Sequence, residues 1–401
     1  MQHVANGNLS DAKNAKNDEF YTQFLDIEKE MNSYLDYDPG TFKDKTVLLP
    51  CDDPEWSNFT KYFAQNFKKL GLKKLISTSY APDSRVINML SQPTLFESLS
   101  PQFDATKTKV KGKIFTLTRD ITGDEQINVE DLEWDYLEGD GDFRSEEIRK
   151  LRDEADVVIT NPPFSLFREF LAWIVEAEKQ LVIIGNMNAV TYKEVFPLIQ
   201  TDRLWLGATG NGNDMVFAVP PGATVKASDK EKAARLGYEG DYTRLGNSCW
   251  FTNIDHGRRH QPLALMSQAD NKKFSKHKAV NGVGYKKYDN YDAIEVPYTD
   301  AIPSDYIGVM GVPITFLSKY NPDQFEILGI TKTWDDGSGL KTHTYPTQIQ
   351  VSRDGSMSQV GKLNDGAAIA VKTAPDGTYY KVGKKMLVQM YARILLKHRS
   401  Q

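Results

Sequence analysis

The chain has 401 residues, of which 40% are hydrophobic and 26% charged, a composition that excludes a disordered or fibrous protein. This length predicts two domains, or one large domain with an appended module. The longest purely aliphatic run is 181–184 and the first 30 residues are polar, so we expect no membrane span, no secretory signal and a cytoplasmic location. Cys51 and Cys249 have no paired spacing, which excludes a disulfide framework and leaves both as expected small core residues.

Charge is distributed unevenly along the chain. The net charge is −5, but residues 256–401 hold 20 Lys and Arg against 13 Asp and Glu, so they carry +7 and residues 1–255 carry −12. Contacts of Lys and Arg with phosphates supply most of the non-specific affinity for nucleic acids. The C-terminal part therefore suits a polyanionic partner, with an ordinary solvated surface as the equally weighted alternative.

In the first half of the chain, short apolar runs alternate with helical patterns, which is typical of a doubly wound α/β fold with a parallel sheet. The spacing of apolar residues predicts a helix from Phe59 to Leu70 that ends at Gly71, and Ser165 is expected to cap a second helix. The expected strands, with those that would complete the same sheet, are 46–50, 74–80, 113–117, 132–137, 156–160, 180–185, 204–206, 215–219 and 249–252.

Beyond Gln261 the pattern changes to turns, aromatic residues and short β-like segments. The best-formed stretch there is 311–330, and the chain closes on a basic apolar segment, 386–399. This shift predicts a boundary between a first domain, 1–260, and a second region, 261–401.

The tetrad Asn161-Pro162-Pro163-Phe164 directly follows the apolar strand 156–160 and precedes a helix. It is therefore expected at the carboxyl edge of a parallel sheet, where such folds bind ligands. A chance match to this tetrad has odds below about 1% for a chain of this length. The alternative is a rigid Pro-Pro turn that merely ends a strand.

The residue types of the tetrad suit one chemistry. The exocyclic amine of adenine is a poor nucleophile, because its lone pair is delocalised into the ring. Two fixed acceptors, the Asn161 side-chain oxygen and the Pro162 carbonyl, can hold both amino protons and direct the lone pair toward a methyl donor. The prolines lock φ, so these acceptors need not reorganise, and Phe164 can stack on a base flipped out of the duplex. No attacking cysteine is required, which argues against cytosine C5 methylation.

Together with its neighbouring segments, the tetrad makes the chain resemble the EcoRI-type adenine-specific (N6) DNA methyltransferases over most of its length. The segments that carry the resemblance are 18–23, 51–54 with 57–59, 141–145, the tetrad with the following 165–169, and 184–188. The resemblance implies a Rossmann-like methyltransferase sheet in 1–260 and a C-terminal DNA target-recognition region in 261–401. It also implies S-adenosyl-L-methionine as cofactor, double-stranded DNA as partner, no metal, a monomer, and a restriction-modification system with a cognate endonuclease encoded nearby.

Carried over residue by residue, the resemblance implies a cofactor pocket made of Phe20, Tyr21, Thr22, Asp53, Pro54, Asp142 and Phe143. The first three would hold the methionine part of the cofactor. Asp142 would accept the adenine amino group and Phe143 would pack on the ring, as suits an adenine edge and face. Two features depart from the family. The usual glycine-rich turn is replaced by 55–58, and no acidic residue ends the second strand to bind the ribose, for which Asp83 is a weak substitute.

Weaker patterns in the basic half suggest DNA contacts by Arg258, Arg259, Lys272, Lys273 and Lys276. The arginines lie between His256 and His260, and the lysines are interleaved with aromatic residues, namely Phe274, Tyr285 and Tyr288. Solvated surface is the alternative throughout, and we expect it for Arg393, Lys397 and Arg399. The glycine-rich loop 207–214 either closes over the flipped base or simply connects strands.

Two other functions stay open at this point. The tetrad also suits methylation of RNA or of a protein glutamine amide, because both present planar amino groups. A catalytically inactive DNA-binding module on the same fold is the alternative from a different class.

Overall fold

The computed structural model describes residues 20–50, 52–54, 57–81, 100–210, 215–219, 225–335, 337–359 and 361–399. They belong to two compact units, Met1–Met187 with Trp205–Gly257, and Asn188–Leu204 with Arg258–Gln401. The division into 1–260 and 261–401 with separate functions stays a prediction, and the units differ from it in grouping 188–204 with the C-terminal residues. No helix among the described residues is long and apolar enough to cross a membrane.

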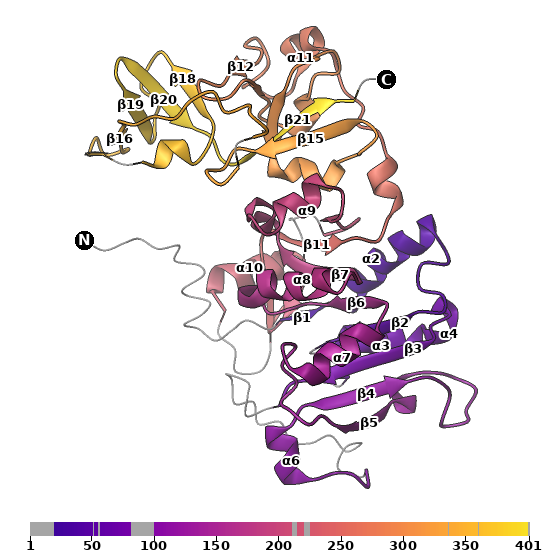
Figure 1. The fold of residues 1–401 in the computed structure, drawn as a ribbon. Coiled ribbons are helices and arrows are strands. Elements are labelled where there is room, and N and C mark those ends of the chain that lie inside the picture. The colour runs from indigo at the N-terminus through magenta and orange to yellow at the C-terminus, as the bar shows by residue number, and fades with distance from the viewer. Residues whose placement is uncertain are drawn as a thin grey trace. The chain divides into compact units, whose positions relative to one another are not determined.

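The first unit contains an eight-stranded mixed sheet (Figure 1). Its strands in spatial order are β5 (Glu133–Tyr136), β4 (Lys113–Leu117), β3 (Lys74–Ser79), β2 (Thr46–Leu49), β6 (Val157–Thr160), β7 (Gln180–Asn186), β11 (Ser248–Thr252) and β8 (Trp205–Leu206). The central strands β3, β2, β6 and β7 are parallel, as expected. The outer strands on both sides pair antiparallel, so the sheet is mixed, with the predicted parallel strands at its centre.

Alternate residues of a strand point to opposite faces of the sheet. Consecutive residues of β2 and β6 are buried, so helices cover both faces of the parallel strands. Val47 and Val157 belong to the core cluster that contains side chains of α2 (Phe24–Tyr37) and α3 (Asn58–Gln65). On the other face, α8 (Phe167–Glu176) packs on β7 and α7 (Glu146–Glu154) on β2. A Cβ at Gly185 would lie 2.8 Å from Phe167 Cζ, so only glycine permits this close packing of α8 on the sheet.

Three local expectations need correction. The predicted helix from Phe59 to Leu70 is interrupted at Asn66, giving α3 and the short α4 (Phe67–Leu70), although Gly71 does end it in the left-handed conformation. Ser165 does not cap α8, because Phe164–Leu166 form a 3-10 turn closed by a hydrogen bond from Leu166 N to Pro163 O. The segment 215–219 forms β9 (Val216–Ala218) outside the large sheet, between β1 (Tyr21–Thr22) and β10 (Tyr242–Arg244).

The second unit is built mainly from two five-stranded sheets, in agreement with the turn-rich β pattern of the C-terminal sequence. One contains β12 (Lys286–Lys287), β13 (Ile294–Glu295), β14 (Met310–Pro313), β21 (Arg393–His398) and β15 (Phe325–Ile330). The other contains β17 (Met357–Gln359), β16 (Ile349–Val351), β19 (Tyr379–Val382), β20 (Lys385–Gln389) and β18 (Ala368–Val371). Two short helices, α9 (Phe196–Gln200) and α11 (Gln268–Phe274), belong to the same unit; α6 (Ala105–Val110) and α10 (Ala227–Arg235) belong to the first.

A buried ion pair lies inside the first of these two sheets. The Arg393 guanidinium donates to both carboxylate oxygens of Glu295, at 2.7 to 3.1 Å, and the Tyr288 hydroxyl donates to the same carboxylate. A Cβ at Gly311 would lie 2.7 Å from Tyr288 Cε2, so glycine leaves the space for this ring. Arg393 is only 8% exposed, and the expectation that it belongs to a solvated face is therefore wrong.

Replacing Arg393 with Ala should lower the free energy of unfolding by about 3–5 kcal/mol, because Glu295 would remain buried without its counter-charge. Lys397→Ala on the same strand is the matched control, since its pair with Glu326 is largely exposed and should contribute at most about 1 kcal/mol. Urea denaturation followed by circular dichroism measures both. Equal, small effects of the two substitutions would contradict a structural role for the buried pair.

Candidate active site

The carboxyl ends of β2 and β6 lie at the point where the order of the parallel strands reverses. The chain continues from β2 to β3 on one side, whereas β6 and then β7 lie on the other side of β2. Doubly wound sheets bind ligands at such a switch point. The Thr160 hydroxyl donates to Pro50 O at 3.0 Å and so joins the two strand ends. The tetrad begins at the next residue, which confirms its expected place at the strand end.

The Asn161 amide is oriented by a residue far away in the sequence. Its Nδ2 donates to the carbonyl of Phe20 at 2.8 Å. Its Oδ1 is buried and has no hydrogen-bond partner among the described residues. A buried acceptor of this kind costs about 1–3 kcal/mol, so native proteins leave few of them unpaired. The site thus presents an acceptor that is already oriented for a donor which a ligand can bring.

Three aromatic rings, those of Phe20, Phe217 and Phe164 of the tetrad, pack on one another. The Phe164 centroid lies 6.4 Å from that of Phe20 and 6.5 Å from that of Phe217, and the Phe20 and Phe217 centroids are 6.3 Å apart. Phe217 was not among the sequence candidates. It is brought here by β9, which pairs with β1 so that Phe217 lies opposite Thr22. The Phe164 ring, supported by Phe20 and the fully buried Phe217, can offer a flat face to a base.

The turn after β2 is held by hydroxyl groups instead of glycines. The carbonyl of Asp52 accepts from Thr60 Oγ1 at 2.8 Å and from Ser77 Oγ. The Ser57 hydroxyl donates to Asp52 Oδ1 at 2.7 Å and caps α3 by accepting from Phe59 N. Asp53 and Pro54 lie in this turn, at the same sheet edge as the tetrad. Where the family has a glycine-rich turn at 55–58, this chain thus fixes the turn with hydroxyl groups. Residues 55 and 56, and Asp83, the weak candidate for the ribose contact, lie outside the described residues.

A hydrogen bond also joins this turn to β1, because Asn58 Nδ2 donates to Thr22 O at 2.7 Å. Thr22 and Thr243 both lie opposite Phe217, on neighbouring strands, and so share one face of the small sheet. Their hydroxyl groups are buried and have no partner among the described residues. Thr22 was a predicted cofactor residue, whereas Thr243 was missed, since its strand is only three residues long and has no motif of its own.

Asp142 lies beside the carboxyl end of β3. Gly141 has φ +91, and a Cβ there would come within 3.3 Å of Tyr80 Cα, so the loop approaches the strand closely. The Arg144 guanidinium and the Tyr80 hydroxyl both donate to the carboxylate. Hydrogen bonds from Arg144 are the main reason why the pKa of Asp142 is lowered to about 2. The carboxylate is thus ionised and already carries donors.

The Phe143 ring lies between the Arg144 guanidinium, 5.5 Å from its centroid, and aromatic side chains of α8. It packs edge-on against Phe170 and Trp173, at centroid distances of 5.1 and 5.6 Å, and is buried. A side chain in this position holds the 141–145 loop onto α8. The packing of Phe143 therefore does not support the prediction that its ring stacks on the cofactor.

Of the predicted DNA contacts, the lysines are exposed. Lys272, Lys273 and Lys276 have exposed side chains on or just after α11, and Lys276 pairs with Asp300 at 2.8 Å. Tyr288, by contrast, is buried against Glu295, so the expected interleaving of lysines with aromatic residues is only partly present at the surface.

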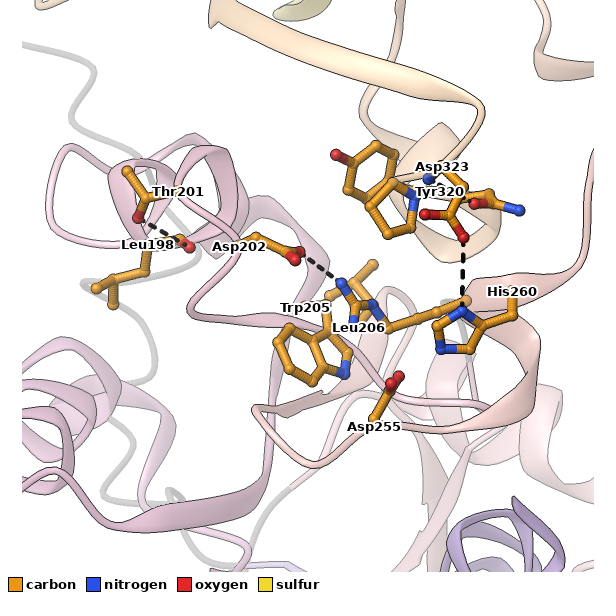
Figure 2. Close-up of polar contacts among 12 residues, drawn as sticks. Leu198, Thr201, Asp202, Trp205, Leu206, Asp255, His260, Tyr320 and Asp323 are labelled. Atoms are coloured by element: carbon orange, nitrogen blue, oxygen red, sulfur yellow. Dashed lines mark hydrogen bonds and ion pairs between the residues drawn. The ribbon is translucent and has the colours of Figure 1, made fainter. Parts of the chain in front are cut away.

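Arg259 is placed differently from the prediction. It is only 6% exposed, lies in the 3-10 helix Gly257–His260, and forms an ion pair with Asp202, whose dashed contact is drawn in Figure 2. His260, which follows it, lies 3.8 Å from Asp323 in the same view. The assignment of Arg259 as a phosphate contact is therefore a mistake of the sequence prediction, because its guanidinium is enclosed by its own unit. The segment 256–260 is not the solvated loop that was considered as the alternative, since His256 is buried as well.

Two features bear on other kinds of chemistry. Cys249 is fully buried, and burial strongly raises the pKa of its thiol, which leaves it no role as a thiolate nucleophile. Among the described ranges, no three His, Cys, Asp or Glu side chains are grouped so that they could hold a metal ion.

An oriented amide oxygen, aromatic rings and a doubly wound sheet together define the class of enzymes that transfer groups to planar amines. The comparisons with known proteins make this specific. The family model described as "Adenine-specific methyltransferase EcoRI" matches residues 8–399, so the chain belongs to the EcoRI family of adenine-specific methyltransferases. It is an adenine-specific DNA methyltransferase with a Rossmann-like catalytic fold.

The curated relatives agree with this membership. The chain is 40% identical to Type II methyltransferase M.EcoRI of Escherichia coli, over 84% of this chain and 92% of that protein. It is 34% identical to Type II methyltransferase M.MpnI of Mycoplasma pneumoniae, over 83% and 89%, and 35% identical to Type II methyltransferase M.MgeORF184P of Mycoplasma genitalium, over 79% and 84%. No solved structure matches the chain.

Replacing Arg259 with Ala should reduce stability and leave the electrostatics of DNA binding unchanged. We expect a loss of about 1–3 kcal/mol on unfolding, less than for a fully buried pair because Asp202 is half exposed. The slope of log K for DNA against log salt should stay at the wild-type value. Urea denaturation and salt-dependent DNA titration measure the two effects. A slope lower by about 1 with unchanged stability would restore Arg259 as a phosphate contact.

Proposed function

We propose that this enzyme methylates N6 of an adenine flipped out of duplex DNA, at a specific site, with S-adenosyl-L-methionine as donor. The observation that carries the proposal is the buried, unpaired Oδ1 of Asn161. The relatives named as Type II methyltransferases support a restriction-modification system with a cognate endonuclease. A monomer acting in the cytoplasm belongs to the same proposal.

In this mechanism the protein acts by positioning. Asn161 Oδ1 accepts a hydrogen bond from one N–H of the adenine amino group and the Pro162 carbonyl accepts one from the other, so that the nitrogen becomes tetrahedral and its lone pair is exposed. The Phe20 carbonyl accepts from Nδ2 of Asn161 and so keeps this nitrogen turned away from the base. In the opposite orientation the Asn161 NH₂ group would face the adenine amino group, and both are donors. Phe164 contacts the base, and Phe20 and Phe217 support its ring.

The residues present fit the cofactor at its methionine end. Thr22 has a buried hydroxyl without a partner, beside the turn that contains Asp53 and Pro54. Tyr21 lies on the same strand as Thr22. When bound, S-adenosyl-L-methionine supplies a methyl group activated by its sulfonium. At the adenine end, we propose that Asp142 accepts the amino group in exchange for part of its present contact with Arg144, while Phe143 anchors the loop.

The DNA surface that we propose lies in the second unit, which would recognise the target. It includes Lys272, Lys273, Lys276 and the half-buried Arg258, and it omits Arg259. Asp300 must give up Lys276 when a phosphate approaches, so this lysine should contribute less than the other two.

Asn161→Ala should lower methyl transfer from labelled S-adenosyl-L-methionine to duplex DNA by about 10²–10³-fold, the loss typical of removing one fixed group that stabilises a transition state. Cofactor binding, measured by calorimetry, should change little, because Thr22 and the Asp53 turn remain. Asn32→Ala on α2 is a control for loss of an amide elsewhere. Full activity of the Asn161 variant would refute the mechanism.

The acceptor is tested with the wild-type enzyme on duplex DNA, RNA and protein side by side. Transfer to duplex DNA alone supports the proposal, and transfer to RNA or to protein amides in preference to DNA contradicts it. Single-molecule sequencing of DNA from an expressing host then identifies the modified base and its context.

The double variant Lys272→Ala with Lys273→Ala should lower the slope of log K against log salt by about 2, because each phosphate contact contributes about one unit. Lys150→Ala on α7 is the matched control, since this lysine is just as exposed but belongs to the first unit. DNA titration between low and moderate salt measures the slopes. Identical slopes for both variants would remove α11 from the proposed DNA surface.

A further inference from the structure

The carboxylate of Glu30 on α2 is buried outside the predicted site and accepts four hydrogen bonds. Tyr34 Oη donates to Oε1 at 2.6 Å and Ala208 N donates to the same oxygen at 2.8 Å. Thr209 donates to Oε2 twice, from its backbone N at 2.7 Å and from Oγ1 at 2.5 Å. The side chain is fully buried, so this is a dry site with four donors converging on one carboxylate.

Three of the four donors come from the described part of the glycine-rich loop that follows β8. A Cβ at Gly207 would collide with the Glu30 carboxylate and lie 2.5 Å from Trp250 Cβ, so glycine allows the loop to close over Glu30. Gly210 has φ +61, and its Cβ position is 2.9 Å from Met215 Sδ. The Met215 side chain, directly before β9, therefore lies close to the backbone of the anchored 207–210 segment.

Glu30 therefore joins the two segments that support the aromatic rings at Asn161. Its helix follows β1, with Gln23 alone between strand and helix, and Phe20 directly precedes that strand. The loop that it binds leads through Met215 to Phe217, and Phe217 pairs with Thr22 of β1. Strand pairing holds β9 at one end, and the Glu30 contacts hold the 207–210 segment at the other.

We propose that Glu30 is a positioning residue for methyl transfer: its ionised carboxylate fixes the 207–210 segment and, through Met215 and β9, the Phe217 ring beside the tetrad. This inference rests on the proposed function. An ionised carboxylate accepts from all four groups at once, and two of them, the backbone N–H groups of Ala208 and Thr209, can only donate.

The arrangement also makes activity depend on pH. Burial raises the pKa of Glu30, opposed by the hydrogen bonds from Thr209, Tyr34 and Ala208. The other titratable groups that face it among the described residues are Tyr34 on its own helix and Cys249 on β11, with His256 beyond Tyr34 at 5.9 Å between ring centroids. The ionised Glu30 therefore holds the 207–210 segment in place above its pKa, and this hold is lost as pH falls through that pKa.

The test compares Glu30→Gln with Asp36→Asn, which removes an exposed carboxylate from the same helix. In Glu30→Gln the amide NH₂ faces a donor, so kcat for DNA methylation should fall at least about tenfold, since small misplacements of reacting groups can cost 10²-fold. The Kd for S-adenosyl-L-methionine should stay within about twofold of wild type, and the acid limb of the pH–kcat profile should vanish. Asp36→Asn should retain the wild-type kcat and limb.

Thr209→Val keeps the side-chain shape but removes one donor to the charged form. It should keep the fold, and it should move the acid limb to higher pH, because the carboxylate is then less stabilised. A shift in this direction is not expected from a merely structural residue.

Wild-type kcat in Glu30→Gln, or an acid limb that neither substitution moves, would overturn the inference while leaving the proposed function intact. Absence of methyl transfer to DNA by the wild-type enzyme would refute the proposed function and the inference with it.

Discussion

The hydrogen bond from Asn161 Nδ2 to the Phe20 carbonyl decides what the catalytic tetrad can do. An asparagine amide has a donor end and an acceptor end, and only the acceptor end suits an adenine amino group. By occupying the donor end, Phe20 leaves Oδ1 turned toward the site and unpaired. Several contacts within the first unit hold Asn161 and Phe20 in these positions.

That requirement explains the arrangement around the sheet edge. β6 brings Asn161 to the switch point, and Thr160 joins β6 to the end of β2. Phe20 belongs to a segment far away in sequence, which is held by strand pairing with β9 and by the bond from Asn58 to Thr22. Glu30 holds the 207–210 segment from the helix side.

The second unit has its own, independent source of stability. Its first sheet surrounds the Arg393–Glu295 pair with Tyr288, and Arg259 pairs with Asp202 of the segment between β7 and β8. Basic residues there thus have two different tasks. The buried arginines pair with carboxylates of their own unit, and the lysines on α11 remain exposed to a polyanion.

The sequence by itself determined the strands of the parallel core, the position of the tetrad at a strand end, and the family. These are local signals: an apolar run such as 157–160 is buried wherever the chain goes, and a tetrad of low chance frequency directly follows it. Only the tertiary structure decided how the Asn161 amide points and that Arg259 and Arg393 are buried. It also decided that β9 lies outside the large sheet and that the loop after β8 donates hydrogen bonds to Glu30. Each of these depends on a partner distant in sequence, 141 residues for Asn161 and Phe20 and 179 for Glu30 and Thr209, and side-chain pairing over such separations leaves no periodic pattern to read.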